Sequence, residues 1–321
     1  MKTEAPSSVG GDGPLVSIVI PAYNHARYLD EAIQSVLRQA YPRIELIVLD
    51  DGSTDSTRNV LARYSGQLYF ETQANMGQAR TINKGWEMAK GDILAYLSAD
   101  DFLMDGAVSA AVELLQSVPE VIVAYCDFNL VDEESRVLRM IRAPDFSFFD
   151  MAVRFVCPPG PGAFLRRSAF LSAGGWDGTL RQVPDYEYWL RLALQGPFRR
   201  IPRVLAGWRI HADSQTFGRA DADKADETIR VTTHFFEMPG VPADIMAAKR
   251  QAFAYAHLFS ARRHILSGRY RRGIHWLWRA LSLYPPLFWA PHTRGLLLNS
   301  MRVRLGIALK RLSGRNQVRK G

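Results

Sequence analysis

Short apolar runs alternate with segments of helical periodicity along the first half of the chain. Runs rich in β-branched residues predict strands, whereas apolar residues recurring three and four positions apart predict helices. The pattern predicts strands over 16–20, 44–49, 67–71, 93–97 and 121–125, and helices over 27–38, from Ser53 or Thr54 onward, over 77–89 and over 105–116. This alternation is typical of a mostly parallel sheet with helices on both faces.

The second half is irregular at first and then helical. Residues 146–216 contain a Pro- and Gly-rich loop at 158–162 and a helix that begins at Asp185. From about Ala220 to Tyr284 apolar residues recur at helical spacing, and a last basic amphipathic helix is predicted over 296–312. We therefore expect a flexible leader over 1–14, an α/β domain over 15–220 with halves at 15–126 and 127–220, and a basic helical region over 221–321.

The net charge of +8 is unevenly distributed. Residues 251–321 contain twelve Arg, two Lys and no Asp or Glu, a charge of +14 that leaves −6 for residues 1–250. A basic amphipathic region of this kind suits an anionic membrane surface, and the alternative is a helical cap with a solvated basic face. We expect no nucleic-acid partner, because no recognisable nucleic-acid module accompanies the charge.

The two cysteines, Cys126 and Cys157, have no metal-binding spacing and cannot build a disulfide framework, which favours a reducing compartment. The leader lacks the apolar stretch of a signal peptide, and no run of about eighteen apolar residues follows it. The sequence predicts a cytoplasmic protein, peripheral on the inner face of the membrane if the basic region binds there.

Polar clusters follow three of the predicted strands, at 21–24, 50–51 and 98–101. Ligands of parallel sheets bind beyond the carboxyl ends of the strands, so we expect these clusters to converge on one edge. The adjacent carboxylates Asp100 and Asp101 repel each other, and a divalent cation such as Mg²⁺ or Mn²⁺ would offset them. The alternative is that one of them caps the following helix and the other is solvated.

The remaining candidates also allow two interpretations each. Asp50 and Asp51 begin a tight turn before a helix, which suits either a nucleotide contact or an ordinary turn. Arg80 either faces a phosphate or lies on a helix surface. Asp185 is either an N-cap or a general base with a modestly raised pKa. His211 is either structural or functional.

The order of these motifs along the chain is more specific than any one of them. The chain reads VSIVIPAYN at 16–24, IVLDDGSTD at 47–55, NMGQAR at 75–80 and YLSADD at 96–101, followed by GGWD at 174–177, DYEYWLR at 185–191 and WRIH at 208–211. Over residues 15–216 this order resembles glycosyltransferase family 2, whose fold is the GT-A fold. The resemblance implies a Rossmann-like α/β domain with a nucleotide-sugar half followed by an acceptor half.

The resemblance also assigns roles to residues of this chain. Asp185 would be the catalytic base, and Asp100 and His211 would hold a divalent metal, Mg²⁺ or Mn²⁺. Residues around the donor would be Pro21, Ala22, Tyr23, Asn24, Asp50, Asp51, Arg80, Ser98, Ala99 and Asp100. Residues on the acceptor side would be Asp101, Gly175, Trp176, Tyr186 and Glu187. Two positions depart from the family's pattern, because Ser98 replaces the first Asp of an Asp-x-Asp signature and Pro184 replaces a Glu.

The resemblance implies an inverting transferase that moves a sugar from a nucleotide sugar, a UDP- or dTDP-sugar, to an acceptor hydroxyl. A glycan or lipid-linked acceptor in bacterial surface polysaccharide or glycoconjugate assembly would fit this chemistry. Two alternatives stay open. One is a catalytically inactive, nucleotide-sugar-binding scaffold, which Ser98 and Pro184 keep open. The other is a nucleotidyltransferase, against which stands the lack of a Gly-rich phosphate loop after the first strand.

Overall fold

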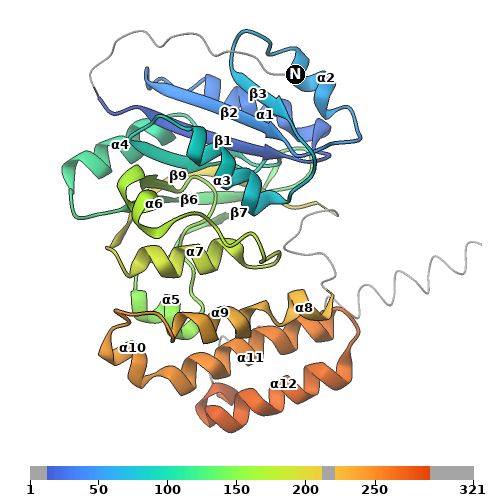
Figure 1. The fold of residues 1–321 in the computed structure, drawn as a ribbon, viewed down its shortest axis with the longest axis vertical. Helices are drawn as coiled ribbons and strands as arrows, with labels where there is room; N and C mark the ends of the chain where they lie inside the picture. The colour runs from blue at the N-terminus through green and yellow to red at the C-terminus, as the bar shows by residue number, and fades with distance from the viewer. Residues whose placement is uncertain (1–12, 212–220, 290–321) are drawn as a thin grey trace, which may run out of the picture. The chain divides into compact units, whose positions relative to one another are not determined.

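A computed structural model describes residues 13–211 and 221–289, and these form two compact units (Figure 1). The first unit contains the described residues up to Met151 and from Val156 to His211. The second contains Ala152–Phe155 and residues 221–289. Most of the predicted leader, residues 1–12, and the predicted helix over 296–312 lie outside the described residues.

The fifth predicted strand, over 121–125, is present as the longer β6 (Val123–Val131), which ends six residues later. The first four predicted strands are confirmed, with ends that differ by at most two residues. They are β1 (Val16–Ala22), β2 (Ile44–Asp50), β3 (Tyr69–Thr72) and β4 (Ile93–Tyr96). All three pairings among them are parallel, in the order β3-β2-β1-β4. In this register Ala22 lies opposite Asp50, so the polar segments that follow β1 and β2 begin side by side.

The helices that follow these strands are α1 (Ala26–Leu37), α2 (Thr57–Ala62), α3 (Gln78–Met88) and α4 (Ala107–Ser117). One predicted boundary is wrong, because α2 begins at Thr57 and not near Ser53 or Thr54. Ser53 and Thr54 instead bond to Asn24, as described below. Such bonds compete with helix formation and favour a loop conformation at these two residues.

The second part of the same sheet is mixed. It contains β5 (Phe102–Leu103), β6 (Val123–Val131), β7 (Val137–Ile141), β8 (Phe164–Arg166) and β9 (Phe198–Arg209). Strand β8 pairs antiparallel with β4 and β6, and β6 pairs parallel with β9. Helices α5 (Phe148–Arg154), α6 (Arg167–Ala173) and α7 (Pro184–Ala193) lie between these strands in the chain. The expected Rossmann-like α/β fold with flanking helices is confirmed.

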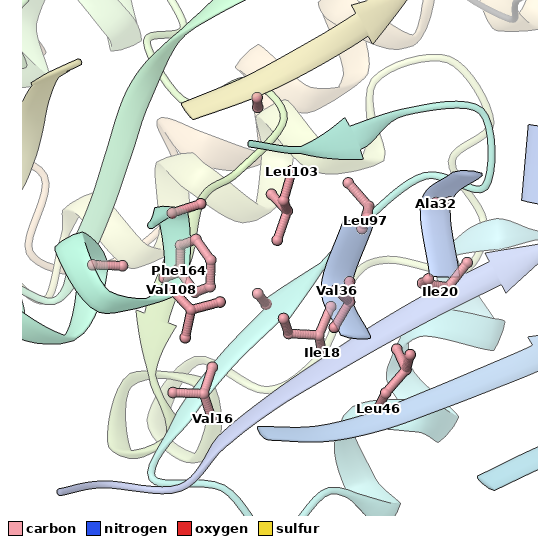
Figure 2. Close-up of a cluster of buried hydrophobic side chains, with 14 of the residues drawn as sticks. Val16, Ile18, Ile20, Ala32, Val36, Leu46, Leu97, Leu103, Val108 and Phe164 are labelled. Carbon is pink, nitrogen blue, oxygen red and sulfur yellow. The ribbon is translucent and has the colours of Figure 1, made fainter. Parts of the chain in front are cut away.

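The core of the first unit lies against β1, whose seven residues are all buried. Figure 2 shows Val16, Ile18 and Ile20 of this strand in the buried cluster. Val16, Ile18 and Ile20 pack in one cluster with residues of α1 and α4, and a strand buried on both faces reads as a continuous apolar run. On α3, a side chain added at Gly85 would lie 2.4 Å from Val19 Cγ1, so this glycine allows α3 to approach β1 closely.

The second unit is entirely helical over residues 221–289, which confirms the expected helical extension there. Its elements are α8 (Ala222–Ala225), α9 (Glu227–Phe235), α10 (Ala243–Ala247), α11 (Lys249–Leu266), α12 (Tyr270–Leu283) and the 3₁₀ helix η1 (Pro285–Phe288). Ala254, Leu258, Ala280 and Leu287 form its small core. Among the described helices of the chain, none has the length and apolarity needed to cross a bilayer.

Candidate active site

Two loops at the carboxyl ends of β1 and β2 are bonded to each other through Asn24. The Asn24 backbone N–H donates to Ser53 Oγ at 2.9 Å, and its side-chain Oδ1 accepts from the Thr54 N–H at 2.8 Å. Asn24 has a φ of 56°, a left-handed conformation that asparagine tolerates better than most residues. Tyr23 beside it is 47% exposed, whereas Pro21 and Ala22 are buried in β1. The structure therefore brings the first two predicted clusters together.

The carboxylates of Asp50 and Asp51 are buried and satisfied by neighbouring loops. Asp50 Oδ1 accepts from the Ser53 N–H at 2.9 Å. Asp51 accepts from the backbone N–H groups of Met76 and Gly77, both at 2.8 Å. Buried carboxylates bonded in this way fix the backbone around them. Asp51 thus attaches the loop before α3 to the end of β2.

Two arginines lie beside the N-terminus of α3. Gly77 has a φ of 88°, and a side chain added there would collide with the Arg181 guanidinium. Arg80, in the first turn of α3, packs against Gly178 in the same loop as Arg181. Arg80 was predicted from the sequence. Arg181 was not, because nothing in the pattern around it distinguishes it from a surface arginine.

The turn after β4 separates the two adjacent carboxylates that the sequence grouped. Asp100 Oδ2 lies 2.9 Å from His211 Nε2 and 3.9 Å from His25 Nε2. Asp101 is buried, and its Oδ1 accepts from the Arg209 N–H at 2.9 Å. Burial and the charge of Asp100 raise the pKa of Asp101 well above its usual value. Asp100 and His211 therefore come together as predicted, while Asp101 is engaged inside the fold.

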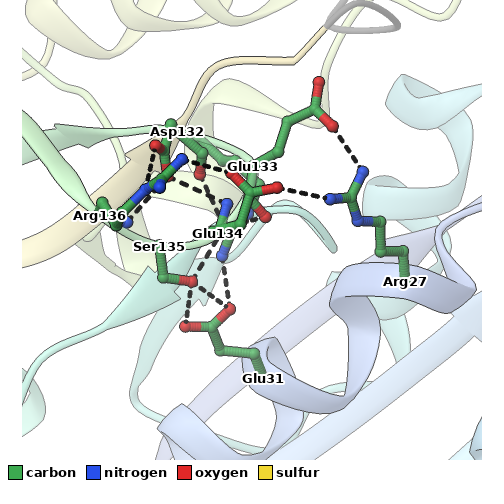
Figure 3. A network of polar contacts seen from close by, with 8 residues as sticks. Arg27, Glu31, Asp132, Glu133, Glu134, Ser135 and Arg136 are labelled. Carbon is green, nitrogen blue, oxygen red and sulfur yellow. Dashed lines mark hydrogen bonds and ion pairs between the residues drawn. The ribbon is translucent and has the colours of Figure 1, made fainter.

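Arg209 holds this turn in place from inside the fold, where its side chain is only 1% exposed. Its Nε donates to the Asp100 carbonyl at 2.8 Å, and its Nη2 pairs with Glu31 Oε2 at 2.5 Å. Its Nη1 donates to Ser135 Oγ at 3.0 Å. Ser135 in turn donates to Glu31, as Figure 3 shows. The sequence showed Arg209 only as part of a motif. Its role depends on segments more than seventy residues apart in the chain.

Asp185 lies in the first turn of α7, directly after Pro184. Burial raises the pKa of Asp185 above its usual value. Hydrogen bonds from the backbone N–H groups of Tyr186 and Asp185 lower it, but by less. Burial raises the pKa of Tyr96 in β4, and the negative charges of Asp185 and Asp101 raise it further. The pKa of Tyr96 therefore responds both to Asp185 and to Asp101 in the turn that follows β4.

The residues predicted on the acceptor side are held firmly around α7. Asn83 bonds to both the N–H and the carbonyl of Trp176, at 2.7 and 2.8 Å. Glu187 pairs with Arg191 at 2.6 Å, and Arg191 donates to the Gly175 carbonyl at 2.6 Å. The Tyr186 hydroxyl donates to the Met151 carbonyl at 2.7 Å. These contacts fix Gly175, Trp176, Tyr186 and Glu187 in place.

The remaining donor-side residues, Ser98 and Ala99, form the turn itself, in which the Ser98 carbonyl accepts from the Asp101 N–H at 3.0 Å. Among residues 13–211 and 221–289, no three His, Cys, Asp or Glu side chains form a group that could hold a metal. Asp100 and His211 offer one carboxylate oxygen and one imidazole nitrogen. This pair fits a divalent ion whose other ligands are phosphate oxygens and water.

This chain matches a known family model and several known glycosyltransferase sequences. The model of glycosyl transferase family 2 matches residues 17–170. An uncharacterised glycosyltransferase of Nostoc sp. is 35% identical over 225 residues, 66% of this chain and 70% of that protein. One from Rickettsia typhi is 30% identical over 64% of this chain and 67% of its own length. The chondroitin synthase of Escherichia coli is 26% identical over 66% of this chain but only 31% of its own length.

Solved structures show the same fold at low identity. S. aureus TarS 1–349 in complex with UDP-GlcNAc has a TM-score of 0.59 at 14% identity, covering 84% of this chain and 91% of that one. The mannosyltransferase PcManGT from Pyrobaculum calidifontis, in complex with GDP-Man and Mn²⁺, has a TM-score of 0.60 at 17% identity. That match covers 91% of this chain and 81% of the other. At these identities the likeness concerns the fold alone.

Proposed function

Because this chain belongs to glycosyltransferase family 2, we propose that it transfers a sugar from a nucleotide sugar to an acceptor hydroxyl with inversion at the anomeric carbon. The observation that carries the proposal is the pairing of Asp100 with His211, together with the half-buried carboxylate Asp185 at the start of α7. Tyr96 responds to the charge of both Asp185 and the turn that holds Asp100. One group can bind the leaving diphosphate while the other accepts a proton.

The bonded loops after β1 and β2 form the proposed nucleotide site. Tyr23 offers an exposed aromatic ring to a base, and Asn24, Asp50 and Asp51 hold the surrounding backbone in place. Arg80 supplies a cation for the diphosphate beside the N-terminus of α3. TarS and PcManGT were solved with UDP-GlcNAc and GDP-Man, which supports a nucleotide-sugar donor. We propose a UDP- or dTDP-sugar.

Asp100 and His211 would hold a divalent cation, as the Mn²⁺ in the PcManGT complex suggests by analogy. A bound Mg²⁺ or Mn²⁺ offsets negative charge on a leaving diphosphate. Arg209 orients the backbone of Asp100, so the carboxylate is preorganised for that task.

Asp185 is the proposed general base. It removes the proton of the acceptor hydroxyl as that oxygen forms a bond to the anomeric carbon and the bond to the nucleoside diphosphate breaks. A single displacement of this kind inverts the anomeric configuration. The raised pKa of Asp185 makes its carboxylate a stronger base, so activity should rise with pH as Asp185 ionises above the ordinary aspartate value.

For the acceptor, we propose a chemical class and not a particular molecule. A glycan or a lipid-linked saccharide in bacterial surface polysaccharide or glycoconjugate assembly fits the family, and one relative is named a chondroitin synthase. The second candidate is an inactive scaffold that binds nucleotide sugar. Ser98 in place of a carboxylate in the turn before Asp100 is the observation that favours it.

Release of nucleoside diphosphate from a panel of nucleotide sugars, with Mn²⁺, Mg²⁺ or EDTA, tests the proposal. We expect release from one donor, its loss with EDTA, and a fall of about 10²- to 10⁴-fold in Asp185→Asn. Asp105→Asn, which changes an exposed carboxylate outside the site, is the matched control and should retain activity. If one donor binds but neither hydrolysis nor transfer occurs with any acceptor tested, the scaffold replaces the enzyme.

A further inference from the structure

Large apolar side chains are exposed along one side of α12 in the second unit. Tyr270, Ile274 and Trp278 follow one another at four-residue spacing and are 54%, 64% and 64% exposed. Residues four apart lie on the same side of a helix, so the three form a continuous stripe. Phe288, the last residue of η1, and Trp289 after it are exposed as well.

This stripe is not the side by which α12 packs in its own unit. Gly273 and Ala280 are the buried residues of α12, and a side chain added at Gly273 would contact Ile265 of α11 at 2.7 Å. Ala280 packs with Ala254 and Leu258 of α11 in the small core. The helix is therefore held by Gly273, Ala280 and the half-buried Trp276, which stacks on His257 of α11. Ile274 and Trp278 face outward instead.

Basic side chains adjoin the stripe on the same helix. Arg271, Arg272, His275 and Arg279 are exposed, and residues 251–321 contain no acidic residue that could neutralise them within that stretch. At 100° per residue, Arg271 follows directly after Trp278 around the helix, and His275, Arg279 and Arg272 continue that sector. An exposed apolar sector with an adjoining cationic sector is the pattern of a helix that lies in a membrane interface.

We propose that this surface, named here the α12 surface and made of Tyr270, Ile274 and Trp278 with Arg271, Arg272 and Arg279, binds the interface of an anionic phospholipid bilayer. The aromatic rings suit the boundary between headgroups and acyl chains. The arginines suit the phosphate groups of anionic lipids. The helix would lie in the plane of the membrane. The sequence indicated only that the basic region over 251–321 could bind a membrane. The proposal assigns that binding to one face of α12.

Sedimentation of the full-length protein with vesicles tests this proposal. We expect binding to vesicles of phosphatidylcholine mixed with phosphatidylglycerol, and much weaker binding to phosphatidylcholine alone. Ile274→Ser combined with Trp278→Ser should lower the partition coefficient by at least about tenfold, because two large apolar side chains leave the interface. Arg271→Gln and Arg279→Gln should each lower it roughly fivefold at low salt.

Two matched controls distinguish this surface from general stickiness. Leu171→Ser removes a side chain on α6 that is 67% exposed, and Arg139→Gln removes an exposed cation on β7. Both should bind vesicles like the unchanged protein. Circular dichroism confirms that each variant is folded, and sedimentation velocity reports its mass.

Three results would overturn the proposal. The first is equal binding by the Ile274/Trp278 variant and the unchanged protein. The second is a change of oligomeric mass in that variant without vesicle binding by either form, which would assign the surface to a second copy of the chain. The third is binding that disappears with salt but does not respond to the apolar substitutions, which would indicate a nonspecific polyanion surface. None of these results depends on transferase activity, so the two proposals can fail separately.

Discussion

At the scale of single residues, the turn after β4 shows how two identical side chains acquire different tasks. Asp100 pairs with His211, whereas Asp101 accepts the Arg209 N–H inside the fold. The sequence could predict that two adjacent carboxylates need compensation. It could not predict which one pairs with His211, because the partners of the two carboxylates lie at the end of β9 and just after it, more than a hundred residues later.

The raised pKa of Asp101 makes a prediction about stability. Its folded pKa lies above its unfolded value, so the stability associated with its protonated form is present at acid pH and is lost as the pH rises through the folded pKa. Asp101→Asn keeps an oxygen for the Arg209 N–H and carries no charge. We therefore expect it to raise the free energy of unfolding by about 1 kcal/mol at neutral pH and by nothing below the ordinary aspartate pKa.

Urea unfolding at several pH values measures this difference, with the exposed Asp105→Asn as the control. A loss of stability in Asp101→Asn at neutral pH would show that the ionised carboxylate is instead a favourable partner of Arg209.

At the scale of elements, local periodicity sufficed for β1 to β4 and their helices but not for the strands that complete the sheet. Strands β5 and β8 are two and three residues long, too short to carry a period. Strands β6 and β9 pair along their lengths with register shifts near Asp127. The loop bonds of Asn24 likewise delay the start of α2, which propensity alone places earlier.

The loop before α3 offers a test of how this site is built. Gly77 has a positive φ, and a side chain there would also strike the Arg181 guanidinium. Gly77→Ala should therefore cost about 1–3 kcal/mol of stability and weaken donor binding, since Asp51 accepts the Gly77 N–H.

Gly174→Ala is the matched control, because Gly174 has a φ of 74° but no atom within 4 Å of an added side chain. It should lose stability through backbone strain alone and keep its donor affinity. Donor affinity is measured by calorimetry. If both variants lost it equally, Arg181 and the loop before α3 would not be part of the nucleotide site.

At the scale of the whole molecule, the sequence predicted the α/β fold, the helical extension and the grouping of polar clusters at one sheet edge. The central functional claim is that two carboxylates of the first unit divide the work. In the proposed mechanism Asp100 and His211 would bind the diphosphate, and Asp185 would accept the proton of the acceptor hydroxyl. Substituting each one should therefore damage a different step.

The most direct test is a calorimetric titration of nucleotide-sugar donor into the protein with Mn²⁺, paired with a turnover assay on the same samples. We predict that Asp185→Asn binds donor as tightly as the unchanged protein but turns it over about 10²- to 10⁴-fold more slowly. Asp100→Ala should lose the Mn²⁺-dependent part of donor binding. Full turnover in Asp185→Asn, or unchanged Mn²⁺-dependent binding in Asp100→Ala, would contradict this division of work.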